Sequence, residues 1–426
     1  MSKNAPPRAN DVRGQAVLLL RVFLPFAFAY FLAYIFRGVN AVIFPYLERD
    51  IGITAGDLGL LTSAYFLFFA GCQPILGVAL DRHGPRRVQA LLLAGAALGS
   101  ALFGLAAGLP ELILARVLIG LGFAGGLMAA IKAITLWYPR RHWALITGFH
   151  MMAGGAGSMA ATLPVQWSLS VMSWQGLFFW LAGLCLTTAL LLFIVVPERT
   201  VAVSHGPLRH QFIATLVVLT DGFYWRIQPL IAVQQLFFIG CISLWIGPWL
   251  RDVGGIADNE ARADLQLYTT ATMTLGFALS GVIAGLCRRI GINDFTSTSV
   301  ISFLFALVCG WFAFAAPSHL LIPLALFGFL GACTIQYLPV MAASFPPNYA
   351  GRVTTSSNLV TFMVLFAGQW AIGKVVDLWP KTATGYAPDG YTWAFGSLFI
   401  LQLAGLAWLL LSRAQPRARA PLVAAE

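Results

Sequence analysis

Long runs of apolar residues, separated by short polar links, recur along the whole chain. A helix needs about 20 apolar residues to cross the hydrocarbon core of a bilayer. We expect twelve such spans, at 22–45, 57–79, 88–108, 111–137, 143–165, 174–196, 228–250, 264–286, 296–316, 319–345, 353–378 and 391–412. The pattern therefore predicts an all-α membrane protein with twelve transmembrane helices.

The longest polar link divides these spans into two groups of six. We expect a cytoplasmic N-terminus (1–21), a first six-helix bundle (22–196), a cytoplasmic linker (197–227), a second six-helix bundle (228–412) and a cytoplasmic tail (413–426). Part of the linker is apolar, so we expect an amphipathic helix on the membrane surface there. Two such bundles joined by a central linker are typical of transporters built from repeats.

Composition and charge agree with a membrane protein. The chain is 59% hydrophobic and only 10% charged, whereas soluble proteins carry about 25% charged residues. The net charge of +10 comes mainly from Lys and Arg in alternate links, which places both termini in the cytoplasm. This topology accounts for the basic excess, so we expect no nucleic-acid partner.

Several other functions find no support in the sequence. The six cysteines are scattered through apolar segments without a CxxC pair, so neither disulfides nor a zinc site are expected. There is no phosphate-binding G-x-x-x-x-G-K-[ST] loop, and no carboxylate or His cluster typical of a membrane enzyme. We expect a monomer in the cell membrane, with no enzyme activity and no cofactor.

The link between the second and third spans carries a motif of glycines and charged residues. It reads GVALDRHGPRR, from Gly77 to Arg87. This segment resembles the signature of the major facilitator superfamily, G-x-x-x-D-R-x-G-x-[RK]-[RK], and the resemblance covers essentially the whole chain. The matching residues are Gly77, Asp81, Arg82, Gly84, Arg86 and Arg87.

The resemblance implies that this motif is a conformational latch on the cytoplasmic side. In the family, the acidic residue, here Asp81, faces the start of the eleventh helix, where the helix dipole favours a negative charge. Gly77 and Gly84 allow a tight turn and close helix approach. An ordinary solvated turn is the alternative. The corresponding link of the second half has Arg288 in place of the acid.

Arg37 lies inside the first span, where a full charge costs a few kcal/mol and generally faces a cavity or a partner. Lys132 and His150 also lie within spans, but no Asp or Glu lies deep in any of them. This imbalance predicts that a substrate supplies the negative charge, because a guanidinium offers paired donors to a carboxylate or phosphate. The alternative is that Arg37 pairs with carbonyls or Asn40 for structure.

A narrower resemblance strengthens this hypothesis. The pattern R-x-x-N-A-x-x-x-P-Y-L from Arg37, followed by GDLG, is similar to the first span of organophosphate:phosphate antiporters and related anion–cation symporters. The resemblance implies that Arg37 binds the anion, assisted by Lys132 and His150. The family's second arginine, in span seven, is absent here, which favours a carboxylate over a phosphate ester.

The predicted substrate-binding residues are those that a central cavity would place near the anion. They are Arg37, Lys132, His150, Tyr30, Tyr34, Gln234, Gln235 and Trp245. For Lys132 the alternative is a side chain that extends to the membrane surface, and for His150 it is packing. Arg116 matches a further family position. It lies near Glu111 at the outer end of its span, where its side chain could extend to the membrane surface, and its expected role is either packing or coupling.

The sequence therefore predicts a secondary active transporter that moves a small organic anion by alternating access. The first alternative is a multidrug or metabolite efflux carrier of the same fold. The second is a receptor that binds an anion without moving it. Substrate identity, direction of transport and the choice between proton symport and anion exchange do not follow from the sequence.

Overall fold

The structure is a computed structural model that describes residues 17–139, 143–198, 216–314, 319–345, 350–382, 385–412 and 414. Within these residues all regular secondary-structure elements are helices. The only β interaction among them is an isolated bridge between Lys381 and Tyr386. The polar N-terminus, most of the central linker and most of the C-terminal tail lie outside the described residues, and so does the amphipathic helix expected there.

The helices of the described residues fall into two groups on either side of the linker. The first half, residues 17–198, contains η1 (Leu19–Phe23), α2 (Leu24–Ile51), α3 (Ala55–Gly71), α4 (Gln73–Leu105), α5 (Leu109–Phe123), α6 (Gly126–Trp137), α7 (Trp143–Ala160), α8 (Leu163–Val171) and α9 (Trp174–Val195). The second half, residues 216–414, contains α11 (Gly222–Gly240), η3 (Cys241–Trp245), α12 (Ile246–Asp252), α13 (Asn259–Arg289), α14 (Asp294–Phe314), α15 (Leu321–Cys333), η4 (Thr334–Gln336), α16 (Tyr337–Ala343), α17 (Ala350–Val376) and α18 (Pro388–Leu411).

Ten helical segments of the described chain are long and apolar enough to cross a membrane. The two other predicted spans are interrupted. One consists of α3, with 17 residues, and the first turns of α4. The other consists of α7 and the short α8, which are separated at Ala161–Thr162. The all-helical membrane fold predicted from the apolar pattern is thus confirmed.

Local chemistry sets the helix ends where they differ from the predicted ones. α2 continues to Ile51, six residues beyond the predicted end, and stops at Gly52 in a left-handed conformation, as glycine commonly does after a helix. Helix α11 begins at Gly222, whereas the predicted span begins at 228. There the Asp221 carboxylate caps the helix by accepting from the backbone N–H groups of Phe223 (2.8 Å) and Tyr224 (3.1 Å), which favours an earlier start.

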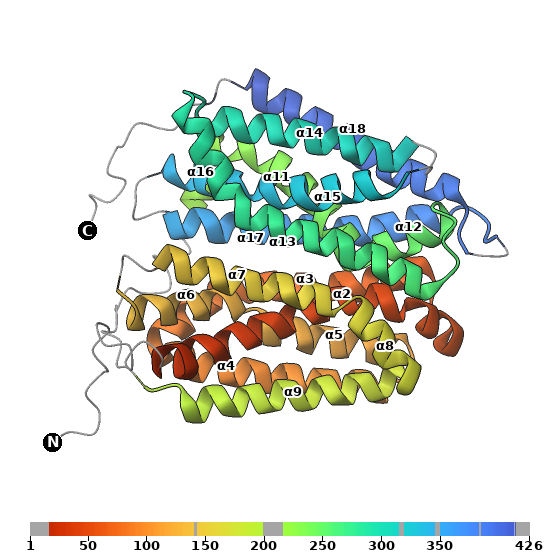
Figure 1. Cartoon of the computed structure of the whole chain (residues 1–426), viewed down its shortest axis with the longest axis horizontal. Coiled ribbons are helices and arrows are strands. Elements are labelled where there is room, and N and C mark those ends of the chain that lie inside the picture. The colour runs from red at the N-terminus through yellow and green to blue at the C-terminus, as the bar shows by residue number, and fades with distance from the viewer. Residues whose placement is uncertain are drawn as a thin grey trace.

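The two halves lie side by side, with their helices running along a common direction (Figure 1). The first half forms the lower layer of that view and the second half the upper one. α3 packs lengthwise against α17, and α7 packs against α13. A cavity enclosed between the halves is therefore lined by helices from both.

Polar contacts join the halves at the end of the bundle that holds the start of α3 and the start of α18. We refer to it as the sealed end. The backbone N–H of Gly56 donates to Asp377 Oδ2 (2.7 Å), and that of Ala55 donates to the Tyr386 hydroxyl (2.7 Å). Glu48 pairs with Lys381 (2.8 Å) and with Arg251 (3.6 Å).

Two further observations show how firmly the sealed end is held. The hydrogen-bonded ion pair with Glu48 raises the pKa of Lys381, because it stabilises the protonated ammonium group. The backbones also approach closely. A Cβ added to Gly59 of α3 would lie 2.6 Å from the carbonyl oxygen of Gln369 of α17. Only a glycine fits at this contact without a shift of the neighbouring helix.

The motif predicted as a latch lies on α4. Gly84 has a φ of 76°, which glycine adopts without strain, so the chain turns there as expected. Arg86 and Arg87 approach Glu198, at the end of the same half, at 4.0 and 2.5 Å, and Arg82 is exposed. Gly77 and Asp81 are on the helix, but their side-chain surroundings fall outside the described part. The latch role stays a prediction.

Candidate substrate-binding site

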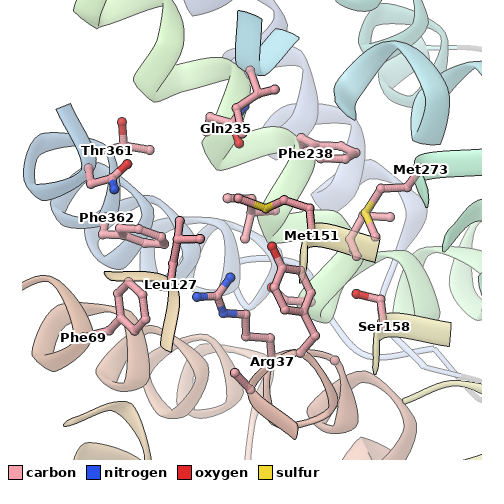
Figure 2. A pocket seen from close by; sticks show the side chains of 18 of the residues that line it. Arg37, Phe69, Leu127, Met151, Ser158, Gln235, Phe238, Met273, Thr361 and Phe362 are labelled. Atoms are coloured by element: carbon pink, nitrogen blue, oxygen red, sulfur yellow. The ribbon is translucent and has the colours of Figure 1, made fainter. Parts of the chain in front are cut away.

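A cavity of about 190 Å³ lies between the two halves. At about 30 Å³ per water molecule, this is room for on the order of six waters, and thus for a small organic molecule. Residues from both halves line the cavity, and Figure 2 shows several of their side chains around Arg37. The helices that contribute lining residues include α2, α3, α6, α7, α11, α13 and α17.

Arg37 comes from the middle of α2 and its guanidinium points into this cavity (Figure 2). Its Nε donates to the Tyr65 hydroxyl over 3.4 Å. Its central carbon lies over three aromatic rings, at 4.7 Å from the centre of Tyr34, 4.9 Å from Phe69 and 6.0 Å from Phe362. Such cation–π contacts contribute about 0.5–2 kcal/mol each, depending on burial.

No carboxylate of the described residues lies within 4.0 Å of the Arg37 nitrogens. The described residues that line the cavity include no Asp, Glu, Lys or His, so Arg37 is the one charged group among them. An aromatic ring attracts a cation more weakly than a carboxylate does. The guanidinium therefore remains a strong site for an anion that enters the cavity.

Tyr30 and Tyr34 also line the cavity, as the sequence predicted for them. Their hydroxyls are 3.3 Å apart. His150 of α7 lies behind them, since it is buried and stacks on the Tyr30 ring with 4.4 Å between ring centres. His150 Nε2 has no hydrogen-bond partner among the described residues. His150 is thus in contact with a residue of the cavity but is not itself among the described lining residues.

The other expected binding residues are divided between the cavity and the protein interior. Gln235 lines the cavity. Its neighbour Gln234 points away, because it both donates to the Ser302 carbonyl and accepts from the Ser302 hydroxyl, each at 3.0 Å. Trp245 is fully buried, and Lys132 is half-buried on α6. Neither of these two is among the described lining residues, so their placement differs from what the sequence led us to expect.

Arg116 of α5 is buried rather than extended to the membrane surface. Its Nη1 donates to the Phe36 carbonyl (2.8 Å), and its guanidinium lies over the rings of Phe103 and Phe178. Of the roles considered for Arg116, extension to the surface is thus wrong and packing is the one observed. A coupling role stays a prediction.

Sequence reasoning missed the residues that hold Arg37 in place. Tyr65, which accepts from Arg37, and Phe362, from the opposite half, carry no signal beyond apolar helix positions. The same holds for Phe69 of α3, whose ring also lies under the guanidinium. Residues from different helices meet at the arginine, and only the three-dimensional packing reveals that.

Comparisons with known proteins agree with this architecture. Residues 26–369 match the family model of the Major Facilitator Superfamily. Two solved structures have the same fold. A bacterial homologue of the human lysosomal transporter Spinster has a TM-score of 0.71 and 19% identity, covering 92% of this chain and 96% of that one. A D-xylose–proton symporter has a TM-score of 0.70 and 15% identity, covering 92% and 97%.

Similar sequences include transporters of sugar acids. The D-galactonate transporter of Escherichia coli O6:H1 is 27% identical over 202 residues, 47% of this chain and 46% of that protein. The hexuronate transporter of Escherichia coli K12 is 24% identical over 290 residues, 63% and 66% respectively. The galacturonate transporter of Dickeya chrysanthemi is 28% identical over 166 residues, 37% and 46%. The chain thus spans about half to two thirds of the length of these relatives.

Proposed function

Because this chain belongs to the Major Facilitator Superfamily, we propose that it is a secondary active transporter of small organic anions. The observation that carries the proposal is Arg37, a guanidinium that faces the central cavity without a carboxylate partner among the described residues. A charge-assisted pair with a carboxylate would satisfy this group. The names of the similar sugar-acid transporters support the same class of substrate.

The transport cycle would consist of alternating access to the Arg37 cavity. The contacts of the sealed end, such as Gly56 to Asp377, hold the halves together there. In the opposite state these contacts must separate while contacts at the other end form. A bound anion favours whichever state gives it more contacts, and Arg37 and Phe362 meet across the halves. Movement of one half relative to the other would thus alter the anion's surroundings.

We propose that the sealed end is extracellular and that the termini are cytoplasmic. The support is the distribution of basic residues. Arg86 and Arg87 follow the turn in α4, and Arg288 and Arg289 end α13, all at the end opposite the sealed end. Cytoplasmic ends of membrane helices and their loops carry an excess of Lys and Arg. In this orientation the motif from Gly77 to Arg87 is the cytoplasmic latch. The remaining binding residues of the proposal are Tyr30, Tyr34 and Gln235.

The test begins with thermal unfolding of the purified protein. It is screened against sugar acids, aromatic and aliphatic carboxylates, the uncharged amides of the same acids, and organic cations. The best stabiliser is then followed as a radiolabelled solute into proteoliposomes that contain the same unlabelled solute. We expect an anion to stabilise the protein and to exchange, and Arg37→Gln to abolish both effects.

A matched control is Arg49→Gln. Arg49 is an exposed arginine at the end of α2 that pairs with Asp50, so its loss should leave both readouts unchanged. A cation as the best stabiliser would instead support an efflux carrier. Anion binding without any exchange would support a receptor. Either result contradicts the proposed function.

A further inference from the structure

The side chains around Arg37 indicate the chemistry of the uncharged part of the transported anion. Resting on the proposed function, we propose that the transported anion is an amphipathic monoanion, with one carboxylate or sulfonate and an aromatic or compact aliphatic body. This differs from the polyhydroxylated acids named for the similar transporters. The argument rests on three properties of the cavity, namely its apolar lining, its occupied polar groups and its single charge.

Apolar side chains dominate the space that faces the guanidinium. Figure 2 shows Leu127 and Phe362 close to Arg37, with Met151, Phe238 and Met273 across the cavity. Each apolar surface favours a cargo that removes it from water, by about 25 cal/mol per Å². Placing cargo hydroxyls against such surfaces without hydrogen bonds would cost free energy instead.

Most polar side chains that line the cavity are already used within the protein. Ser357 donates to Gln228 (2.7 Å), and Thr361 accepts from the same glutamine (3.1 Å). The Thr162 hydroxyl donates to the Met159 carbonyl near the end of α7, and the Thr270 hydroxyl donates to the Gln266 carbonyl of its own helix. Gln235 donates to Thr334 (3.2 Å). These groups have limited capacity left for a ring of cargo hydroxyls.

Three lining residues show no side-chain hydrogen bond within the described structure. They are Ser158, Gln266 and Asn358, on α7, α13 and α17. Because they come from three separate helices, they suit an isolated polar substituent better than hydroxyls on adjacent carbons. An aromatic acid with one ring hydroxyl is an example of a body that fits this pattern.

The single guanidinium limits the cargo to one full charge. A second carboxylate in the cavity would have no cationic partner among the described lining residues, and an unpaired charge away from water is strongly unfavourable. The cavity volume of about 190 Å³ also excludes lipid-sized acids, since it corresponds to only on the order of six water molecules. Methionines at 128, 151 and 273 can adapt their shape to different rings.

The test compares ligands that differ in the body but share the charge. Affinities of phenylacetate, cyclohexylacetate, D-galactonate and D-galacturonate are measured by titration calorimetry at about pH 8, where every carboxylate is ionised. Phenylacetamide controls for binding of the body alone. We expect both apolar acids to bind at least roughly tenfold more tightly than the two sugar acids, and the amide to bind weakly.

A pair of adjacent methionines tests the lining directly. Met151 lines the cavity, whereas Met152 is 48% exposed and points away. We expect Met151→Gln to weaken phenylacetate binding by roughly tenfold, because it replaces an apolar contact with an amide. Met152→Gln should leave the affinity unchanged. Met151→Gln should also reduce the ratio between the affinities for phenylacetate and D-galactonate.

The outcomes separate this inference from the proposed function. If sugar acids bind as tightly as phenylacetate or more tightly, and Arg37→Gln abolishes their binding, the apolar-body inference is overturned while the anion transporter stands. If every anion in the panel binds equally well to Arg37→Gln, both are overturned. If Met151→Gln and Met152→Gln have equal effects, the cavity lining does not select the body and the inference fails.

Discussion

Arg37 is surrounded by aromatic rings and one tyrosine hydroxyl instead of a carboxylate, and this environment determines what the cavity can attract. A carboxylate partner would neutralise the guanidinium permanently. Rings position it through weaker contacts and leave its terminal nitrogens available to a ligand. Arg37 Nε donates to the Tyr65 hydroxyl, the one side-chain hydrogen bond of Arg37 within the described residues, which leaves the paired Nη donors for the substrate.

The Tyr65 hydroxyl is therefore expected to orient Arg37 without contributing a charge. Tyr65→Phe removes one hydrogen bond worth about 1 kcal/mol, so we predict that anion affinity falls by roughly fivefold while selectivity among anions is retained. Tyr138→Phe is the control, because the Tyr138 hydroxyl donates to the Leu18 carbonyl away from the cavity. Calorimetric titration measures both variants. An unchanged affinity in Tyr65→Phe would show that Arg37 is oriented by the rings alone.

The sequence identified Arg37 as a candidate binding residue but did not predict which side chains surround it. A charge inside an apolar run is visible without a structure, as are Tyr30 and Tyr34 on the same helical face as Arg37. Gln234 and Gln235 are equivalent in sequence, yet only Gln235 lines the cavity, because Ser302 of a distant helix occupies both polar groups of Gln234. Such choices depend on packing between helices and leave no local signal.

At the scale of elements, the contact between α3 and α17 holds the sealed end closed. Gly59 allows the two backbones to meet, and a Cβ there would lie 2.6 Å from the Gln369 carbonyl oxygen. A backbone atom cannot turn aside as a side chain can. We therefore expect α3 and α17 to be driven apart when Gly59 gains a side chain.

Gly59→Ala is predicted to shift the protein toward the state in which the sealed end is open. Gly95→Ala on α4 is the matched control, since nothing lies within 4 Å of the added Cβ. Spin labels at Ser170 and Asp389, exposed positions of the two halves at this end, report the separation by pulsed electron resonance. Cys72 and Cys287 are first replaced by serine, because the other described cysteines are buried. Equal distance distributions in both variants would contradict this role of Gly59.

Asp377 is also predicted to hold the sealed end closed, through a hydrogen bond. It accepts from the Gly56 N–H at the start of α3 (2.7 Å), where the helix dipole favours a negative charge. Asp377→Asn should weaken the sealed state by about 1–2 kcal/mol, which changes the populations by roughly five- to thirtyfold.

The control for Asp377 is Asp294→Asn, which removes an ion pair with Arg288 inside the second half. The same spin-label pair should report a longer separation for Asp377→Asn only. If both substitutions lengthen it equally, the effect is a general loss of charge. In that case the hydrogen bond to α3 does not hold the sealed end.

At the scale of the whole molecule, the sequence predicted the architecture well because the bilayer allows few solutions. Backbone groups in lipid must be paired internally, so long apolar runs become helices. The interrupted spans were harder to delimit. α7 and α8 form one predicted span but break at Ala161–Thr162, and α3 ends at Gly71 inside another. Breaks of this kind line the cavity and depend on the neighbouring helices.

The charge balance of the molecule connects these scales. At the sealed end, Glu48 pairs with Lys381 and Arg251, and Asp377 accepts from the start of α3. Among the described residues that line the cavity, Arg37 is the one charged group, and it faces an apolar space. An unpaired buried charge lowers the stability of the empty protein, and a bound anion restores it. The central claim is therefore that the substrate supplies the negative charge that Arg37 lacks.

The most direct measurement is the affinity of the purified protein for its best-binding organic anion, compared with Arg37→Gln by titration calorimetry. We predict that the substitution weakens binding by at least roughly thirtyfold, since it removes one partner of a desolvated charge pair. The ligand-free Arg37→Gln protein should unfold at the same temperature as the unsubstituted protein or higher. An affinity within threefold of the original, with Arg49→Gln also unchanged, would contradict the account.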